Sequence, residues 1–99
     1  MGKTFYDEYV NHMLRFYFRY KPNRGFKNDV DKTNYIAVDR VVKRLSDNDK
    51  QLLQELYSGK RPVGTTIRAI ATRHNITTST IWDLRYSVTI KIAKERRLL

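Results

Sequence analysis

Residues 69–85 read AIATRHNITTSTIWDLR, and this stretch decides the fold. Four hydroxyl residues in a row, at positions 77–80, stand between Ile76 and Ile81. Thr and Ser are poor formers of helix interiors and rarely fill a core. Such a run suits a loop, the start of a helix, or a surface that hydrogen-bonds a partner. The residues around the run decide among these three interpretations.

The spacing of small and apolar residues around the run is typical of a helix-turn-helix. Ala71 is small enough for two helices to cross closely, and Asn75 tolerates the positive φ that a tight turn requires. Ile76, Ile81 and Leu84 follow Ala71 by five, ten and thirteen residues, which is the spacing of a DNA-reading motif. The hydroxyl run therefore falls at the start of the second helix of the motif.

The ends of the two motif helices can also be predicted. We expect the first helix to be capped by Thr66 and to end near Arg73, and the second to be capped by Thr77 or Thr78. His74 stands where an apolar residue is usual, so we expect it to be partly buried over the turn.

The continuation of the second helix is ambiguous. Residues 86–94 alternate between apolar and polar, which is strand periodicity and would suit a winged helix. Leu84, Val88 and Ile92 also have the i, i+4, i+8 spacing of a helix. Because no turn signal and no partner strand follow, we predict one long helix over residues 78–97.

Three more helices are predicted before the motif. Residues 4–20 form a helix with a broad aromatic face, which suits either the core or a homodimer or partner surface. Residues 21–32 form a loop, and residues 33–45 form a second helix. Ser46, followed by an acidic first turn, caps a third helix that ends at the glycine and proline of residues 58–64. The predicted fold is all-α, a small helical domain of about five helices with a C-terminal helix-turn-helix.

Charge and composition narrow the function. The chain has 99 residues, enough for one small domain, and a net charge of +10. Residues 1–50 carry +4 (11 basic, 7 acidic) and residues 51–99 carry +6 (9 basic, 3 acidic), so the motif lies in the more basic half. Nucleic acid is the commonest partner of such a domain, although acidic proteins and membranes also attract basic chains.

Several other classes are disfavoured. The absence of cysteine excludes disulfides, cysteine zinc sites and cysteine nucleophiles, and fits an intracellular protein. Polar residues interrupt residues 10–20, the longest hydrophobic-looking stretch, and Asp7 and Glu8 interrupt any signal peptide. His12 and His74 lie far apart, and no phosphate-binding glycine loop or carboxylate motif is present. We therefore expect a cytoplasmic protein that is not an enzyme and needs no cofactor, metal or membrane.

The helix-turn-helix interpretation predicts which side chains face DNA. Ile81 and Leu84 face the core, which leaves the other side of the helix outward. Thr methyls and an indole can contact thymine methyls, while hydroxyls and carboxylates can bond base edges. The predicted base-reading residues are Thr77, Thr78, Ser79, Trp82, Asp83 and Tyr86. Two alternatives stay open: Trp82 packs on the N-terminal helix, or Asp83 pairs with an arginine.

Basic and hydroxyl side chains flank the predicted recognition helix. They suit phosphate contacts, which add affinity without sequence information, although a solvated surface role is the alternative for each. The predicted phosphate-binding residues are Lys60, Arg61, Thr66, Arg68, Arg73, Thr80, Arg85 and Lys91.

The motif resembles two related groups of proteins. Residues 45–57 (LSDNDKQLLQELY) and 65–84 (TTIRAIATRHNITTSTIWDL), with the basic continuation to residue 93, resemble region four of bacterial sigma factors. The whole chain is similar to small phage late-transcription regulators of the RinA and ArpU type, although its N-terminal half matches only in length and helical character. The resemblance implies a sigma-like DNA-binding module over residues 46–99 and an N-terminal helical segment for packing or partner contact over residues 1–45.

This resemblance also implies a function. We expect a sequence-specific, double-stranded DNA-binding regulator, a phage or prophage late-gene activator at a promoter in a bacterial host cell or its nucleoid. RNA polymerase is an expected further partner, and a homodimer through the aromatic N-terminal helix is another. The alternatives are a small terminase subunit for DNA packaging and an RNA polymerase-binding protein.

Overall fold

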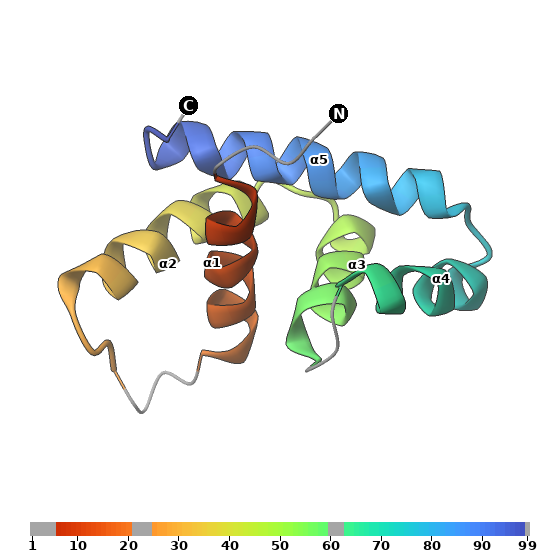
Figure 1. The fold of residues 1–99 in the computed structure, drawn as a ribbon, viewed down its shortest axis with the longest axis horizontal. Helices are drawn as coiled ribbons and strands as arrows, with labels where there is room; N and C mark the ends of the chain where they lie inside the picture. Colours follow the sequence, from red (N-terminus) through yellow and green to blue (C-terminus); the bar gives the residue numbers. More distant parts are fainter. Residues whose placement is uncertain (1–5, 21–24, 60–62, 99) are drawn as a thin grey trace.

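The computed structural model describes residues 6–20, 25–59 and 63–98, which form five α-helices and no strand (Figure 1). The helices are α1 (Asp7–Arg19), α2 (Asp29–Val42), α3 (Asp47–Ser58), α4 (Val63–His74) and α5 (Thr78–Glu95). This confirms the predicted all-α class. Within the described part of the chain, none of these helices is long and apolar enough to cross a membrane.

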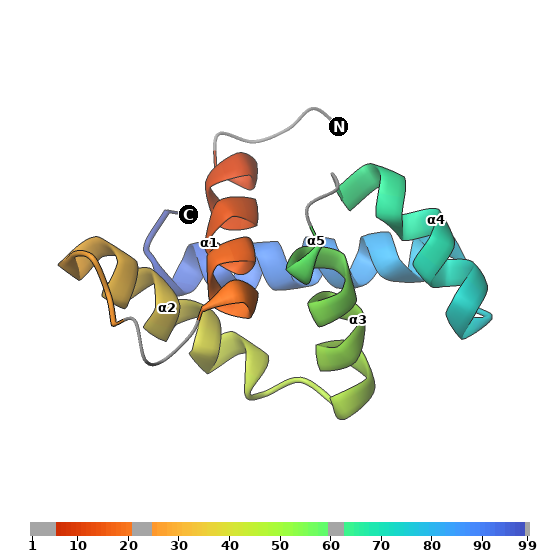
Figure 2. The same ribbon diagram turned by 90° about the horizontal axis from the view of Figure 1, so that it is seen from below.

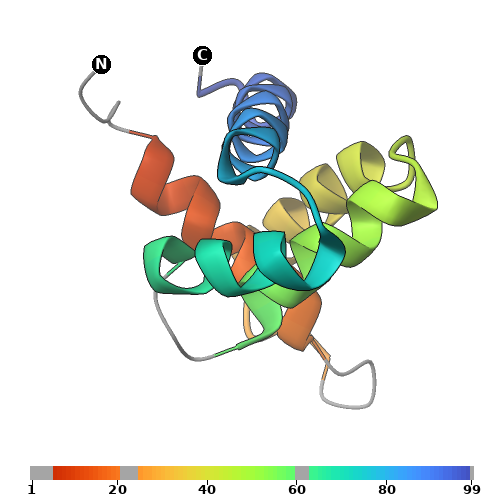
Figure 3. The same ribbon diagram turned by 90° about the vertical axis from the view of Figure 1, so that its right-hand side faces the viewer.

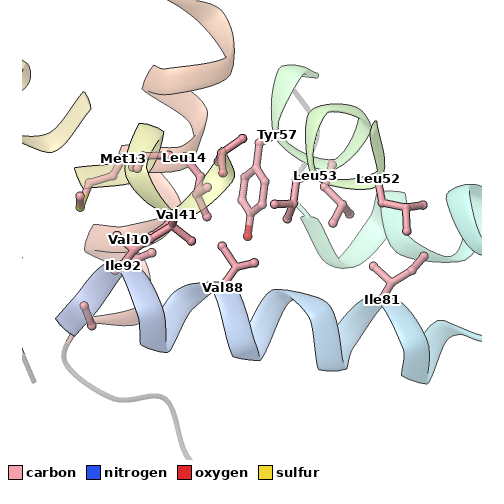
Figure 4. Close-up of a cluster of buried hydrophobic side chains, with 14 of the residues drawn as sticks. Val10, Met13, Leu14, Val41, Leu52, Leu53, Tyr57, Ile81, Val88 and Ile92 are labelled. Carbon is pink, nitrogen blue, oxygen red and sulfur yellow. The ribbon is translucent and has the colours of Figure 1, made fainter. Parts of the chain in front are cut away.

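Helix α5 is the element on which the other four assemble. It runs along one side of the molecule, with α1, α2 and α3 against it and α4 beneath its N-terminal part (Figures 1 and 2). Ile81, Val88 and Ile92 are fully buried and point from α5 into a cluster of side chains from α1, α2 and α3 (Figure 4). Burial of this apolar face explains why residues 86–94 are helical, and the alternative of a wing strand is wrong.

Two helices begin earlier than the sequence predicted. Helix α2 starts at Asp29 instead of Thr33, because Asn28 is its cap and accepts a hydrogen bond at 2.9 Å from the backbone N–H of Asp31. Helix α4 starts at Val63, so Thr66 lies inside the helix and the prediction that it caps α4 is wrong.

The predicted cap of α3 agrees with the structure, and the end of α5 has a cap that was not predicted. Ser46 caps α3, and its hydroxyl accepts from the backbone N–H of Asp49 at 3.2 Å. At the far end of α5, Arg97 adopts φ 57° and the N–H of Leu98 bonds the carbonyl of Ala93 at 2.8 Å. This is a Schellman ending, which satisfies carbonyls that the helix leaves free.

The aromatic residues of α1 are used mostly within the chain. Tyr6, at the start of α1, is buried together with three apolar residues of the helix. Towards its end, Tyr20 stacks on Phe26 with ring centroids 4.8 Å apart, and Tyr17 contacts Tyr35 of α2 at 4.8 Å. These contacts favour the packing role of the aromatic face. A homodimer through this face stays a prediction.

Candidate nucleic-acid interface

The turn between α4 and α5 has a fixed geometry. Asn75 adopts φ 55°, as the sequence predicted for this position. The N–H of Ile76 bonds the carbonyl of Ala71 at 3.0 Å, and the N–H of Asn75 bonds that of Thr72 at 3.2 Å. This is a Schellman motif, and its hydrophobic contact is made by Ile76 packing against the core next to buried Ala71. The crossing of α4 and α5 is therefore set by hydrogen bonds and packing together.

The run of hydroxyl residues divides into two pairs with different tasks. Thr77 is the N-cap of α5: its Oγ1 accepts from the backbone N–H of Thr80 at 3.2 Å and lies 2.9 Å from the Thr80 hydroxyl. Thr78 and Ser79 are exposed, and their side chains have no hydrogen-bond partner among the described residues. The first pair holds the start of the helix, and the second pair is free to meet a ligand.

The outward side of α5 also presents two large rings to solvent. Trp82 is 44% exposed and Tyr86 is 57% exposed, although Ile81 beside them is fully buried. No other described helix covers this side of α5 (Figures 1 and 3). Trp82 belongs neither to the hydrophobic core nor to the half-buried side chains packed against it, so the alternative of packing on the N-terminal helix finds no support. Asp83 is exposed as well and has no ion pair within the described residues.

Arg85 is half-buried and hydrogen-bonds residues of two other helices. Its Nε donates to the Tyr57 hydroxyl and its Nη2 to the Asn11 amide oxygen, both at 3.1 Å. The cause is helical spacing, because Arg85 follows Ile81 by four residues and so shares its inward side. We therefore assign Arg85 to packing in place of the predicted phosphate contact.

The same arginine positions the exposed indole. The Arg85 guanidinium carbon lies 5.4 Å from the centroid of the Trp82 ring, a cation–π distance. Burial raises the pKa of Tyr57, so its hydroxyl stays neutral and can accept from Arg85 while donating to Asn11 at 2.9 Å. Trp82 thus contacts a half-buried side chain that is itself held by hydrogen bonds to α1 and α3.

Glu55 of α3 fixes the end of α4. Its carboxylate pairs with Arg73 at 2.8 Å and with His74 at 2.5 Å, and about one-fifth of both the Glu55 and the His74 side chains is exposed. The partly buried His74 agrees with the sequence prediction. No group of three His, Cys, Asp or Glu residues that could hold a metal occurs among the described residues.

The predicted phosphate-binding residues occupy several different environments. Arg68 is exposed on α4, and Arg73 stays 62% exposed although it pairs with Glu55. Thr66 is half-buried within α4, whereas Thr80 is exposed at the start of α5. Lys91 is also exposed but lies near the other end of α5, about 20 Å from Thr78 at about 1.5 Å per residue. Lys60 and Arg61 lie outside the described residues.

The first turns of α4 and α5 differ in charge from those of the other three helices. The first turns of α1, α2 and α3 carry acidic residues, whereas those of α4 and α5 carry none. An acidic residue in the first turn offsets the positive end of a helix dipole. The starts of α4 and α5 therefore keep a field that attracts anions, and phosphates are bound in this way at many helix N-termini.

Comparisons with known proteins do not place the chain in a family. No family model, no curated protein and no solved structure matches it. The resemblance to sigma region four and to phage late-transcription regulators consequently stays a prediction from the motif.

Proposed function

We propose that this protein is a sequence-specific transcription regulator that binds double-stranded DNA through the start of α5. The observation that carries the proposal is the exposure of Trp82 and Tyr86 beside the free hydroxyls of Thr78 and Ser79. Large rings on a free helix side are costly in water, and a partner that covers them removes the cost. The tight turn between α4 and α5 supports the same interpretation, because a helix-turn-helix joins its two helices by a short turn.

The chemistry of this side suits the major groove of DNA. That groove is about 12 Å wide and admits one α-helix. The Trp82 ring and the Thr78 methyl can contact thymine methyls, the Ser79 hydroxyl can bond either a donor or an acceptor, and the Asp83 carboxylate can accept from the amine of cytosine. We expect the exposed side chains of Arg68 and Arg73 on α4 to contact phosphates beside the groove.

The narrower part of the proposal concerns the biological role. The resemblance to phage late-transcription regulators supports an activator that acts at a promoter, near RNA polymerase. The net charge of +10 supports binding to a polyanion but does not distinguish a promoter from other DNA.

A double substitution of the outward side tests the base-reading role. We expect Ser79→Ala with Trp82→Ala to lower the preference for a selected duplex over a scrambled one by about 30-fold or more, because each good base contact contributes about 1–3 kcal/mol. Binding to scrambled duplex should keep its salt dependence, since the phosphate contacts remain. Duplexes selected by the wild-type chain from a random library supply the site, and fluorescence anisotropy measures both affinities.

The matched control is Ile36→Ala with Ser58→Ala. These residues are also exposed, Ile36 by 40%, but lie on α2 and α3 away from the outward side of α5. The control should keep the full preference. An unchanged preference in the Ser79 and Trp82 variant would remove the start of α5 from base reading. A wild-type chain that prefers no duplex would refute the proposed function itself.

A further inference from the structure

A basic groove lies between the end of α2 and the end of α5. It is separate from the turn between α4 and α5, which, together with the start of α5, we call the recognition turn. The volume of the groove is about 520 Å³. Five cationic side chains and one carboxylate line it, namely Arg40, Arg44, Lys91, Lys94, Arg97 and Glu95. Helix α2 supplies one wall and α5 the other, so two segments far apart in the sequence form this surface.

The single carboxylate leaves most of the positive charge of the groove unbalanced. Glu95 lies 3.7 Å from the Arg40 guanidinium and 3.9 Å from that of Arg44, so it is shared between them without a close pair to either. The two arginine side chains stay 64% and 77% exposed and keep free N–H donors. Lys91 and Lys94 have no carboxylate at ion-pair distance among the described residues. The groove is therefore organised by Glu95 and still strongly attractive to an anion.

A row of side chains on α5 leads from the start of the helix to the groove, on a side of the helix next to that of Trp82 and Tyr86. Residues spaced by three or four lie along one side of a helix. Such a row runs from the start of α5 to the groove: Thr80, Asp83, Ser87, Lys91 and Lys94. Fourteen residues separate its ends, about 21 Å along the helix. With α5 lying along the duplex, this length spans about six base pairs of DNA at about 3.4 Å each.

We propose that this groove is a second phosphate clamp, which holds the DNA backbone about six base pairs from the bases that the start of α5 reads. The inference rests on the proposed function and extends it, because α2 then belongs to the DNA interface. The recognition turn supplies the sequence preference, and the groove supplies affinity that depends on salt and on the length of the duplex.

The lining favours DNA over an acidic protein as the occupant. Protein interfaces depend on aromatic or other large anchors that enter apolar pockets. The only apolar residue among the described residues that line this groove is Val41, and it is 3% exposed. Three arginines and two lysines around a groove without an apolar pocket suit a phosphodiester backbone better.

The test neutralises the α5 wall with Lys91→Gln and Lys94→Gln. Both residues are exposed and Gln forms helices well, so the fold should be kept. On a long duplex centred on the selected site, the slope of log affinity against log salt should fall by about 1.8, because each phosphate contact contributes about 0.9. If the affinity at 1 M salt is unchanged, this is about a 30-fold loss at about 0.15 M salt.

Duplex length and a matched control separate the outcomes. The control, Lys27→Gln with Lys32→Gln, removes the same charge from residues 27–32, before and at the start of α2, and should change the slope less. The duplex is also trimmed on one flank or the other. Removal of one of the two flanks should weaken DNA binding by the wild type and leave DNA binding by the groove variant unchanged. In hydroxyl-radical footprinting, the wild type and the control variant should protect that flank, and the groove variant should not.

Equal slopes for the groove variant and the control on the long duplex would overturn the clamp, and an acidic protein would become the favoured occupant. In that case the wild type still prefers its selected duplex, so the proposed function survives. A wild-type chain with no preference for any duplex would overturn both proposals, and this result differs from the first because it appears before any substitution.

Discussion

Asn75 and Arg97 both hold the left-handed backbone conformation, with φ 55° and 57°, at the ends of α4 and α5. This conformation costs an L-residue with a Cβ roughly 1–2 kcal/mol. The cost is almost nothing for Gly and smaller for Asn than for most other residues. The hydrogen bonds of the two Schellman endings make up for this cost. At Asn75 the same conformation also sets the angle between the two motif helices.

Substitution of Asn75 should therefore report directly on the turn. Asn75→Ala should lower the free energy of unfolding by about 1 kcal/mol, because Ala keeps the Cβ and loses the tolerance of Asn for positive φ. Asn75→Gly should be within about 0.5 kcal/mol of the wild type. Urea unfolding followed by far-UV circular dichroism measures both. Equal stability of the Ala and Gly variants would show that the turn adopts another conformation in solution.

Trp82 and Arg85 show where residue-level prediction succeeds and where it stops. The predicted exposure of Trp82 follows from its place on the helix, and the structure agrees. The sequence predicts Arg85 as a phosphate contact at the flank of the recognition helix, yet its hydrogen-bond partners, Asn11 and Tyr57, come from α1 and α3. Only the assembled helices bring these polar groups together, so the sequence carries no local signal for them.

The network around Arg85 joins three helices and gives a second stability test. Arg85→Ala should cost about 2 kcal/mol, because bonds to a charged group contribute about 1.5–3 kcal/mol and their loss leaves the buried Tyr57 hydroxyl without a donor. Arg68→Ala, an exposed arginine on α4, should change stability by no more than about 0.5 kcal/mol.

Urea midpoints at equal protein concentration compare the two arginine variants. A double-mutant cycle with Asn11→Ala isolates the bond between α5 and α1, and we expect a coupling above about 0.5 kcal/mol. If the two arginine variants were equally stable, Arg85 would be a surface residue in solution, and its predicted contact with phosphate would regain support.

At the scale of elements, capping chemistry explains most of what the sequence predicted and some of what it missed. Ser46 before an acidic turn correctly located α3. Asn28 followed by Asp29 and Asp31 is the same pattern and starts α2. The sequence predicts a loop there, because residues 21–32 combine a proline and a glycine with two asparagines and two aspartates. The groove between α2 and α5 could not be predicted, since the spacing within each helix does not reveal which helices pair.

At the scale of the whole molecule, the described residues form a hydrophobic core to which all five helices contribute. Buried residues of α1 and α2 lie in the same cluster as Ile70 of α4 and Ile81 of α5. The resemblance implies a boundary between residues 45 and 46. This boundary separates two predicted roles, but buried side chains from both sides of it lie in the same core. We therefore expect the predicted DNA-reading turn to depend for its stability on the N-terminal helices.

A core substitution in α1 tests this dependence with a probe in α5. Leu14 is fully buried, so Leu14→Ala should lower the free energy of unfolding by about 2–5 kcal/mol. Trp82 is the only tryptophan, so its fluorescence reports on the motif, while far-UV circular dichroism reports on all helices. In one cooperative unit both signals shift to the same lower urea midpoint. Ile36→Ala is the exposed control. If the circular dichroism midpoint of Leu14→Ala moved while its Trp82 fluorescence midpoint stayed, the motif would unfold independently of α1. Helix α2 could then not hold the proposed phosphate clamp rigidly against α5.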